Sequence, residues 1–466
     1  MKTLFAVLML IFYISLILIV IFAERKRPTE AVLWVLVVVC IPYLGALLYL
    51  IFGSTIGIKL TAYMRKRRLK FDMQKQLLPK SAKISSEDEE VIRFNAVYNR
   101  SELTCYDTAD FFTNGKSHYI QLFNDIKRAK ENIFVEFYTI HDDEVGNAFV
   151  EALTEKAKQG VEVLVLIDFI ANISSPKSMF EPLKEAGGKF IRVKPYLTHY
   201  RSHRKIVTID HKISYIGGMN IGKQYANLAK KKNPWRDTQI RLTGSCTRIL
   251  DEYFLSDWLY SIKRRDCEET LTHVKPMFQV RGPINKNLCQ FVVGGVDTRK
   301  EGVKMTYLSM IRSAKSSIRI QTPYFIPDAS ILDALKTAAA SGVQVELMIP
   351  GIKASFFLDP VTNYYCGQLL EYGAKVHKYN GYIHAKTMVI DGEMCCIGSV
   401  NMDIRSLMVD DEVCGIFYQN SLVNKYNSIY DNDILSTKPY TLEQFKTRTT
   451  WQKFEEAVFM LFAPLF

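Results

Sequence analysis

The chain has 466 residues, of which 48% are hydrophobic and 23% are charged, and its formal net charge is +12 at pH 7. This length suits two ordinary domains rather than one, and the hydrophobic content excludes wholesale disorder. The positive charge favours an anionic partner, either nucleic acid or an acidic membrane surface. Alternatively, some of the excess basic residues serve only to fix the orientation of the chain in a membrane.

Two uncharged stretches predict a transmembrane helical hairpin over residues 1–58. Thr3–Ala23 has 21 residues and Ala31–Gly53 has 23, and each is long enough as a helix to cross about 30 Å of hydrocarbon. The charged segment Glu24–Glu30 separates them, and Pro42 interrupts the second stretch, which spanning helices tolerate. A cleaved signal peptide and a pair of buried core helices are the alternatives. The length of the first apolar stretch argues against the former, and the lack of a polar face argues against the latter.

Basic residues around the hairpin predict its orientation. The linker holds Arg25–Arg27, whereas Lys2, Lys59 and the run Arg65–Lys70 all lie on the other side. Because the larger basic load stays inside the cell, we expect the remainder of the chain to be cytoplasmic. The same run is suited to anionic lipid headgroups.

The rest of the chain reads as a duplicated α/β unit. Segments that begin at Ile126 and Ile311 share one order of helix end, strand, loop, helix and strand. Gly160 and Gly342 close the two helices, as expected for left-handed C-caps. The apolar runs that follow, "VEVLVLID" and "VQVELMIP", suit buried strands. Strands that alternate with helices predict α/β layers.

These patterns divide the chain after the hairpin into four parts. We expect a polar connector over 59–114, a first α/β domain over 115–285, a second over 286–440 and an amphipathic segment over 441–466. The last segment either lies on a membrane interface or packs on the domains. Similar halves can pack about a pseudo-twofold axis, and such packing brings matching motifs together.

One motif occurs twice and predicts the site. "HRKIVTIDHKISYIGGMN" begins at His203, and "HAKTMVIDGEMCCIGSVN" begins 181 residues later at His384. The histidine and lysine of each copy share one face of the chain as it enters a strand. The candidate residues are His203, Lys205, Asp210 and Asn220 in the first copy and His384, Lys386, Asp391, Ser399 and Asn401 in the second. A single copy is typical of a surface hairpin, but two complete copies inside a duplicated unit favour a functional site.

These residue types suit a phosphodiester. Lysine ammonium groups and asparagine amides bind the non-bridging oxygens, where charge builds up in the transition state. We expect Asn220, Ser399 and Asn401 to bind substrate. One imidazole can attack phosphorus and form a covalent intermediate. The other can protonate the leaving alkoxide and then deprotonate the incoming nucleophile. No metal is required, and neither HExxH nor CxxC occurs. The nine cysteines therefore favour buried thiols over a zinc site or disulfides.

Two carboxylates downstream are candidates for orienting the histidines. Asp237 follows His203 by 34 residues, and Glu412 follows His384 by 28. A carboxylate on one ring nitrogen fixes the tautomer and raises the basicity of the other. A surface charge at the start of a strand is the alternative. The aspartates of the repeated motif are expected to brace it internally rather than to touch substrate.

The paired motifs resemble those of the phospholipase D superfamily over about residues 110–440. The resemblance implies two α/β/α sandwich lobes related by pseudo-twofold symmetry, with one metal-free site that works through a phosphohistidine. It implies that the two histidines, their lysines and their aspartates are catalytic and that Asp237 and Glu412 orient the rings. His203 is then the nucleophile.

Within the superfamily the chain is similar to bacterial cardiolipin synthases. This narrower resemblance rests on the hairpin, on the sequences "YRSHRKI", "IGGMNIG" and "GSVNMDIRS" around the motifs, and on the final residues "LFAPLF". It implies transfer of a phosphatidyl group between two phosphatidylglycerol molecules at the bacterial cell membrane, with anionic lipids rather than nucleic acid as partners. His211, where the second copy has Gly392, and "VDDE" before Val413 depart from the usual pattern and leave acceptor preference open. A membrane-bound phospholipase D hydrolase, another acceptor, a tethered nuclease and a non-catalytic scaffold are the rivals.

Overall fold

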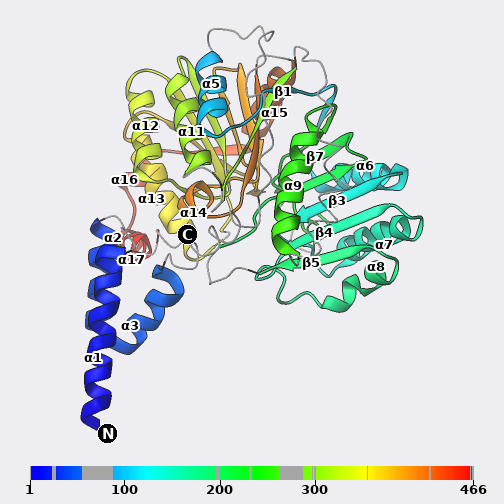
Figure 1. Ribbon diagram of the computed structural model, residues 1–466. Coiled ribbons are helices and arrows are strands. Elements are labelled where there is room, and N and C mark those ends of the chain that lie inside the picture. Colours follow the sequence, from blue (N-terminus) through cyan, green and yellow to red (C-terminus); the bar gives the residue numbers. More distant parts are fainter. Residues whose placement is uncertain are drawn as a thin grey trace. The chain divides into compact units, whose positions relative to one another are not determined.

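The computed structural model divides the chain into two units (Figure 1), Met1–Arg67 with Lys194–Tyr200 and Arg68–Val193 with Arg201–Phe466. It describes residues 2–23, 28–54, 88–194, 200–229, 234–262, 287–295, 298, 301–353, 355–418, 421–461 and 463. The basic segments 24–27 and 55–70, on which the predicted orientation depends, lie outside the described residues.

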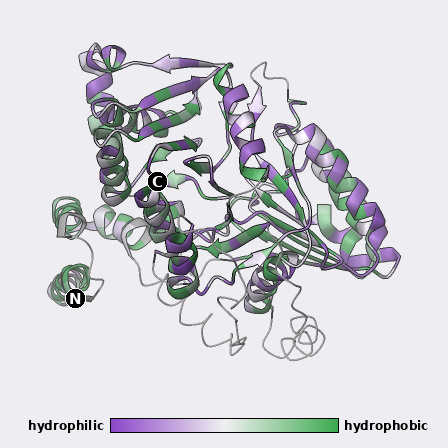
Figure 2. Ribbon diagram, turned by 90° about the horizontal axis from the view of Figure 1, so that it is seen from above, coloured by the Kyte–Doolittle hydropathy of each residue, from purple (hydrophilic) through white to green (hydrophobic). Residues whose placement is uncertain are grey.

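Helices make up nearly all of the described part of the N-terminal unit. Its elements are α1 (Lys2–Leu18), the π-helix η1 (Ile19–Ala23), α2 (Pro28–Cys40), α3 (Pro42–Leu48) and the π-helix η2 (Tyr49–Gly53). Ile41 separates α2 from α3 with a φ of −129°, because the residue before a proline is disfavoured in the helical region. Val20, Val38 and Tyr49 are buried at its centre, and Figure 2 shows these helices as mostly hydrophobic. Among the described residues, none of the helices combines the length and the apolar character needed to cross a membrane.

The first lobe of the larger unit is a seven-stranded sheet in the order β2-β9-β7-β6-β3-β4-β5. Its strands are β2 (Ala109–Phe112), β3 (Asn132–Phe137), β4 (Glu162–Asp168), β5 (Lys189–Val193), β6 (Ile206–Ile209), β7 (Ile213–Gly217) and β9 (Gln239–Thr243). The helices are α6 (Gly115–Arg128), α7 (Glu144–Lys158), η3 (Lys177–Phe180), α8 (Glu181–Glu185) and α9 (Thr247–Ser261). Figure 1 shows α6, α7 and α8 on one face and α9 on the other. Alternation along β3 supplies both faces, since Ile133 and Val135 pack toward α6 and α7 while Phe134 packs toward α9.

The second lobe repeats this topology within a nine-stranded sheet, β1-β10-β19-β17-β16-β11-β13-β14-β20. Its strands are β1 (Thr104–Cys105), β10 (Leu288–Val293), β11 (Ser317–Gln321), β13 (Gln344–Pro350), β14 (Lys375–Tyr379), β16 (Thr387–Ile390), β17 (Met394–Gly398), β19 (Val413–Tyr418) and β20 (Thr437–Tyr440). Its helices are α5 (Glu89–Tyr98), α11 (Gly302–Ser313), α12 (Ala329–Ala340), α13 (Leu358–Leu370), α14 (Ile404–Met408), α15 (Ser421–Ile434), α16 (Leu442–Lys446) and α17 (Thr450–Met460). The seven central strands match those of the first lobe one for one, and β1 and β20 are added at the two edges. The predicted duplication of an α/β unit is therefore confirmed.

Residues 88–112, which the sequence places in a connector, belong to both lobes. Helix α5 packs against α11, β1 pairs with β10 of the second sheet, and β2 pairs with β9 of the first. At the other end of the chain, β20 pairs with β14, and α17 packs against α13. The C-terminal segment is thus attached to the second lobe.

A hydrophobic cluster and short stretches of backbone pairing join the two lobes. Ile216 and Ile240 of the first sheet are buried together with Ile397 and Phe417 of the second. The short strand β8 (Trp235–Arg236) runs parallel to β15 (Tyr382–Ile383). A parallel bridge joins Ser202 to Asp411. These pairings place the start of each motif beside a segment of the other lobe.

Candidate active site

Both histidines line one cavity of about 530 Å³ in the larger unit. Each lies just before a central strand, His203 before β6 and His384 before β16. Their side chains are 13% and 12% exposed, so each imidazole keeps an edge on the cavity while the rest of the ring is buried. The structure therefore brings the two copies of the motif to a single place.

Each histidine is held by a carboxylate from the other lobe. His203 Nδ1 lies 2.8 Å from Glu412 Oε1, and His384 Nδ1 lies 2.6 Å from Asp237 Oδ2. Each acid therefore bonds the histidine of the other half, not the histidine that it follows in sequence. With Nδ1–H donated to a carboxylate, the Nε2 lone pair of each ring is left for chemistry.

Backbone bonds between the lobes impose this crossed pairing. The amide of His203 donates to the carbonyl of Asp411 at 2.9 Å, immediately before Glu412. The amide of His384 donates to the carbonyl of Arg236 at 2.6 Å, immediately before Asp237. Each histidine therefore lies directly beside the residue that precedes its acid. The exchanged pairings between the lobes bring the acids into position.

The small-residue turns of the two copies hold the acids in different ways. A Cβ added at Gly218 would lie 2.1 Å from Asp237 Oδ1, so only glycine leaves room for that carboxylate. Ser399 occupies the same place in the second copy, where its hydroxyl donates to Glu412 and accepts from the amide of Val413. Ser399 is fully buried and is not among the residues that line the cavity. The structure thus places it behind Glu412, whereas the sequence placed it against substrate.

The two motif lysines are buried beneath the histidines, and neither is among the residues that line the cavity. Lys205 Nζ donates to the carbonyl of His203 at 2.6 Å, and Lys386 Nζ donates to the carbonyl of His384 at 2.5 Å. Burial lowers the pKa of Lys205 to about 7 and that of Lys386 to about 8. The nearby carboxylates of Glu412 and Asp237 offset part of the cost of burying two ammonium groups, and an anionic ligand would offset more of it.

Burial also controls the titration of the rings and one acid. It lowers the pKa of His384 to about 4 and holds that of His203 well below its usual range, and the nearby lysine charges add to both shifts. Burial raises the pKa of Glu412 to about 7. In the site as it stands both imidazoles are neutral at pH 7, which is the form that can attack phosphorus or accept a proton.

The two asparagines both line the cavity but differ in their contacts. Asn220 accepts from the amide of Thr139 at 3.3 Å and donates to the hydroxyl of Tyr225 at 2.7 Å. Asn401 is buried, and among the described residues its side-chain oxygen has no hydrogen-bond partner. In the part of the chain that the structure describes, the side-chain oxygen of Asn401 is therefore not engaged as that of Asn220 is.

The motif aspartates brace the fold, as expected. Asp210 accepts from the amides of Lys130, Glu131 and Asn132, and Asp391 accepts from the three amides that begin at Lys315. Each aspartate lies in a turn, where its φ is 52° (Asp210) or 53° (Asp391). From there its carboxylate fixes the loop that precedes a central strand. Neither lines the cavity, so their part in the reaction is indirect.

The departure at His211 has a structural reason in the same turn. His211 has a φ of 54°, where Gly392 of the second copy has 73°. Its ring bonds Asp251 at 2.9 Å and Asn132 at 2.5 Å. These contacts hold a bulky residue in a left-handed conformation that favours glycine.

Several residues at the site were missed by sequence reasoning. Asp403 and Arg405 line the cavity and follow Asn401 by two and four residues. Both lie within the string "GSVNMDIRS", so their closeness to the motif could have identified them. Burial raises the pKa of Asp403 to about 6. Two buried arginines next to the site, by contrast, have no sequence pattern around them that would have identified them. Arg204 bonds Asp257 and the carbonyl of Glu412, and Arg236 bonds Asp433 at 2.6 Å.

Comparisons with known proteins agree with this geometry. The family model described as "Cardiolipin synthase, PLD-like domain" matches residues 122–258 and 307–434, and the model "Phospholipase_D-nuclease N-terminal" matches 8–54. The chain is 36% identical over 476 residues to the major cardiolipin synthase of Bacillus subtilis and 34% identical over 480 residues to the cardiolipin synthase of Listeria welshimeri, and these alignments cover 98% of each chain. Among solved structures, the phosphatidylserine synthase of Haemophilus influenzae matches with a TM-score of 0.62 at 14% identity, over 80% of this chain and 97% of that one. This last likeness concerns the fold.

Proposed function

Because the chain belongs to the family of phospholipase D-like bacterial cardiolipin synthases, we propose that its two-histidine cavity transfers a phosphatidyl group from one phosphatidylglycerol to another. The chain is thus a phosphatidyltransferase whose products are cardiolipin and glycerol. The observation that carries this proposal is the pair of imidazoles on one cavity, each with Nδ1 bonded to a carboxylate of the opposite lobe.

The first step forms a covalent intermediate. Nε2 of His203 attacks the phosphorus of phosphatidylglycerol, and the bond from phosphorus to the departing glycerol oxygen breaks. His384, protonated once the anionic substrate is bound, donates its proton to that oxygen, so that glycerol leaves as a neutral alcohol. Lys205, Lys386 and Asn401 hold the non-bridging oxygens as charge builds on them.

The second step returns the enzyme to its starting state. A second phosphatidylglycerol enters, and the neutral ring of His384 takes the proton from its terminal hydroxyl. That oxygen attacks the phosphohistidine, the bond from phosphorus to Nε2 breaks, and cardiolipin is released. Glu412 stabilises the cationic ring of the His203 intermediate, and Asp237 does the same for protonated His384. In this scheme the lipid alcohol has to outcompete water.

We propose that the N-terminal unit holds the enzyme at the bacterial cell membrane as a two-span hairpin, with the lobes on the cytoplasmic side. Two uncharged stretches and the family match over residues 8–54 support membrane attachment. Exposed apolar side chains such as Leu4, Phe22 and Leu36 support it further. A membrane-held site also raises the local concentration of the lipid acceptor. Phosphatidylglycerol and other anionic lipids are then its partners, with no role for nucleic acid.

Lipid product analysis tests the proposal. Purified full-length chain is incubated with phosphatidylglycerol vesicles, and the products are separated and weighed by mass spectrometry. Cardiolipin and glycerol in equal amounts are expected. Phosphatidic acid with glycerol would instead identify a hydrolase, and a different phosphatidyl ester would identify another acceptor. Protease protection on inside-out vesicles tests the orientation, where protected lobes would overturn the cytoplasmic assignment.

A further inference from the structure

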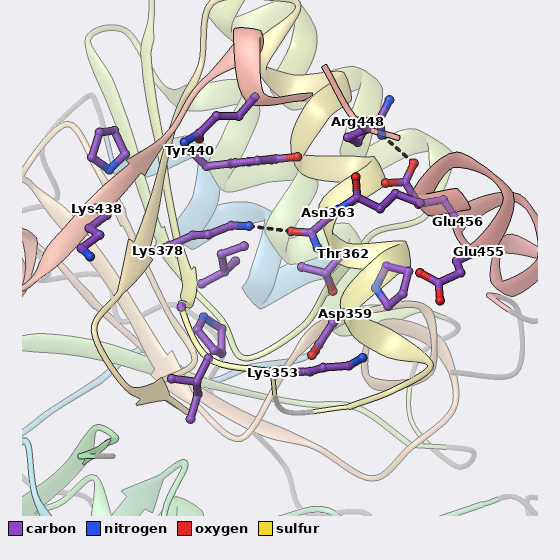
Figure 3. Close-up of a pocket in the computed structure, with 18 of the residues that line it drawn as sticks. Lys353, Asp359, Thr362, Asn363, Lys378, Lys438, Tyr440, Arg448, Glu455 and Glu456 are labelled. Carbon is purple, nitrogen blue, oxygen red and sulfur yellow. Dashed lines mark hydrogen bonds and ion pairs between the residues drawn. The ribbon is translucent and has the colours of Figure 1, made fainter. Parts of the chain in front are cut away.

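A second cavity lies on the second lobe and shares no lining residue with the two-histidine cavity. Its volume is about 770 Å³, and β14, β20, α13 and α17 contribute to its walls (Figure 3). The basic residues that line it are Lys353, Lys378, Lys438 and Arg448. Nothing in the proposed reaction uses these groups.

Two of the lysines are placed directly opposite each other. Lys378 of β14 and Lys438 of β20 are register partners in an antiparallel pair, and both line the cavity. Like charges at directly opposed positions of a sheet are destabilising. An anion between them would remove that cost.

The hydrogen bond and the ring contact of Lys378 are both with neutral groups. Its Nζ donates to Asn363 Oδ1 at 3.0 Å, as Figure 3 shows, and lies 4.0 Å from the centre of the Tyr440 ring. Burial lowers the pKa of Lys378. In the described part of the chain neither Lys378 nor Lys438 forms an ion pair with an acid.

The acids that line the same cavity are engaged elsewhere. Glu456 pairs with Arg448 at 2.5 Å, Glu455 accepts from the indole of Trp451 at 2.9 Å, and Asp359 accepts from the amide of Ser355 at 3.1 Å. These contacts leave Lys353 and the two opposed lysines as the cations that a ligand would meet, with the charge of Asp359 also acting on Lys378. The cavity therefore suits a phosphate.

An aromatic edge borders this cavity. It consists of Phe356, Phe357, Trp451 and Phe454, whose side chains are 51–65% exposed. Phe459 lies on the same helix, α17, as Trp451 and Phe454, and its ring lies 5.3 and 5.2 Å from those of Phe356 and Phe357. The Nζ of Lys353, which lines the cavity, lies 5.2 Å from the Phe356 ring. Exposed aromatics beside basic groups are typical of a surface that lies on a membrane.

We propose that this cavity binds the phosphate of a second anionic membrane phospholipid, whose acyl chains stay in the bilayer against the aromatic edge. The inference rests on the proposed function in taking the enzyme to work at a membrane. It assigns the lipid a place outside the reacting site, on the lobe that carries His384.

Quenching of Trp451 fluorescence tests the proposal. Full-length His203→Ala chain in detergent micelles is titrated with phosphatidylglycerol or phosphatidylcholine that carries brominated acyl chains. The difference from the same chain with Trp451→Phe isolates the signal of Trp451. Phosphatidylglycerol should quench at a lower mole fraction than phosphatidylcholine. Lys378→Gln with Lys438→Gln should raise the phosphatidylglycerol requirement about fivefold or more and leave that of phosphatidylcholine unchanged.

Lys336→Gln is the matched control. Lys336 also bonds a neutral amide, Gln368 Oε1 at 2.6 Å, and lies 5.4 Å from the centre of a tyrosine ring, but it lines neither cavity. If the double variant fails to fold, the exposed Lys438→Gln alone serves as the test. Equal quenching by both lipids, or an unchanged lysine variant, would each overturn the lipid assignment. If the wild-type chain makes no cardiolipin, the proposed function is refuted, but selective quenching of Trp451 by phosphatidylglycerol would still support the lipid site.

Discussion

Nδ1 of His203 lies 2.8 Å from Oε1 of Glu412, a residue 209 positions further along the chain. The reciprocal contact joins His384 to Asp237 over 147 positions. Neither lobe alone contains a histidine with its acid. The crossed contacts make the site dependent on the packing of the two lobes.

Glu412→Gln and Asp237→Asn test the crossed pairing. Each change removes the charge that fixes the tautomer of the opposite histidine, so kcat should fall about 10²- to 10⁴-fold with little change in the thermal unfolding midpoint. Steady-state cardiolipin formation and calorimetry check this. Asp431→Asn is the control, because Asp431 lies on the exposed side of α15 and pairs with Arg319. Wild-type kcat in both acid variants would contradict the orienting role.

Ser399→Ala separates a positioning role from contact with substrate. The hydroxyl donates to Glu412, so its loss leaves that carboxylate less well held. We expect kcat to fall about tenfold with KM for phosphatidylglycerol unchanged. Ser399→Thr keeps the hydroxyl and should recover part of the rate. A raised KM at constant kcat would return Ser399 to the substrate.

Single-turnover trapping tests the two histidine roles. In His384→Ala the nucleophile remains, but both the proton donor for the leaving glycerol and the base for the acceptor are lost. With a phosphatidyl p-nitrophenyl ester, whose leaving group needs no proton, a phosphatidyl adduct on His203 should therefore accumulate. Tandem mass spectrometry of the acid-quenched enzyme locates it. His377→Gln is the control, because His377 lies on β14 and lines neither cavity. An adduct on His384 in the His203→Ala chain would reverse the assignment.

The two buried lysines predict an alkaline limb in the pH profile. The pKa of Lys205 is lowered to about 7 and that of Lys386 to about 8, so the free enzyme loses these charges as pH rises through that range. Binding of an anionic phosphodiester weakens with them, and kcat/KM should decline above about pH 7 to 8. Lys205→Arg keeps the charge that is lost first and should move the onset of the decline from about pH 7 to about pH 8. Initial rates between pH 5 and 10 check this, and a flat profile to pH 10 would refute it.

Much of the architecture could be predicted from local pattern. The apolar runs after Gly160 and Gly342 are strands β4 and β13, and both glycines have the left-handed φ expected of C-caps. These features depend on neighbours in sequence, such as a strand period or a helix end. The two motifs were found for the same reason, since each is a contiguous string.

What could not be predicted depends on contacts between the lobes. The register that places His203 beside Asp411 follows from a bridge between segments about two hundred residues apart. The alternation of buried and exposed residues within a strand does not show which distant segment will pair with it. The same limit explains why Ser399 was assigned to substrate, since nothing in "GSVN" shows that Glu412 would occupy the space in front of it.

Glu136→Gln should stabilise the protein at alkaline pH. Glu136 on β3 is fully buried beside Ser202, and one of its oxygens has no partner among the described residues. Burial raises its pKa to about 8, so the folded state holds a proton that the unfolded state releases above its ordinary pKa of 4.5. Stability therefore falls as pH rises from about 4.5 to 8.

The matching position of β11 is Gln321, a neutral amide that donates to Asp433 at 2.9 Å and accepts from Tyr426 at 2.7 Å. The second lobe thus shows that glutamine fits this position. Glu136→Gln should raise the free energy of unfolding at pH 8 by about 1–3 kcal/mol and have a smaller effect at pH 5. Urea unfolding at both pH values measures this, with the exposed Glu131→Gln on the neighbouring turn as control. Equal effects at the two pH values would show that Glu136 is ionised in the folded protein, balanced by the nearby Arg204.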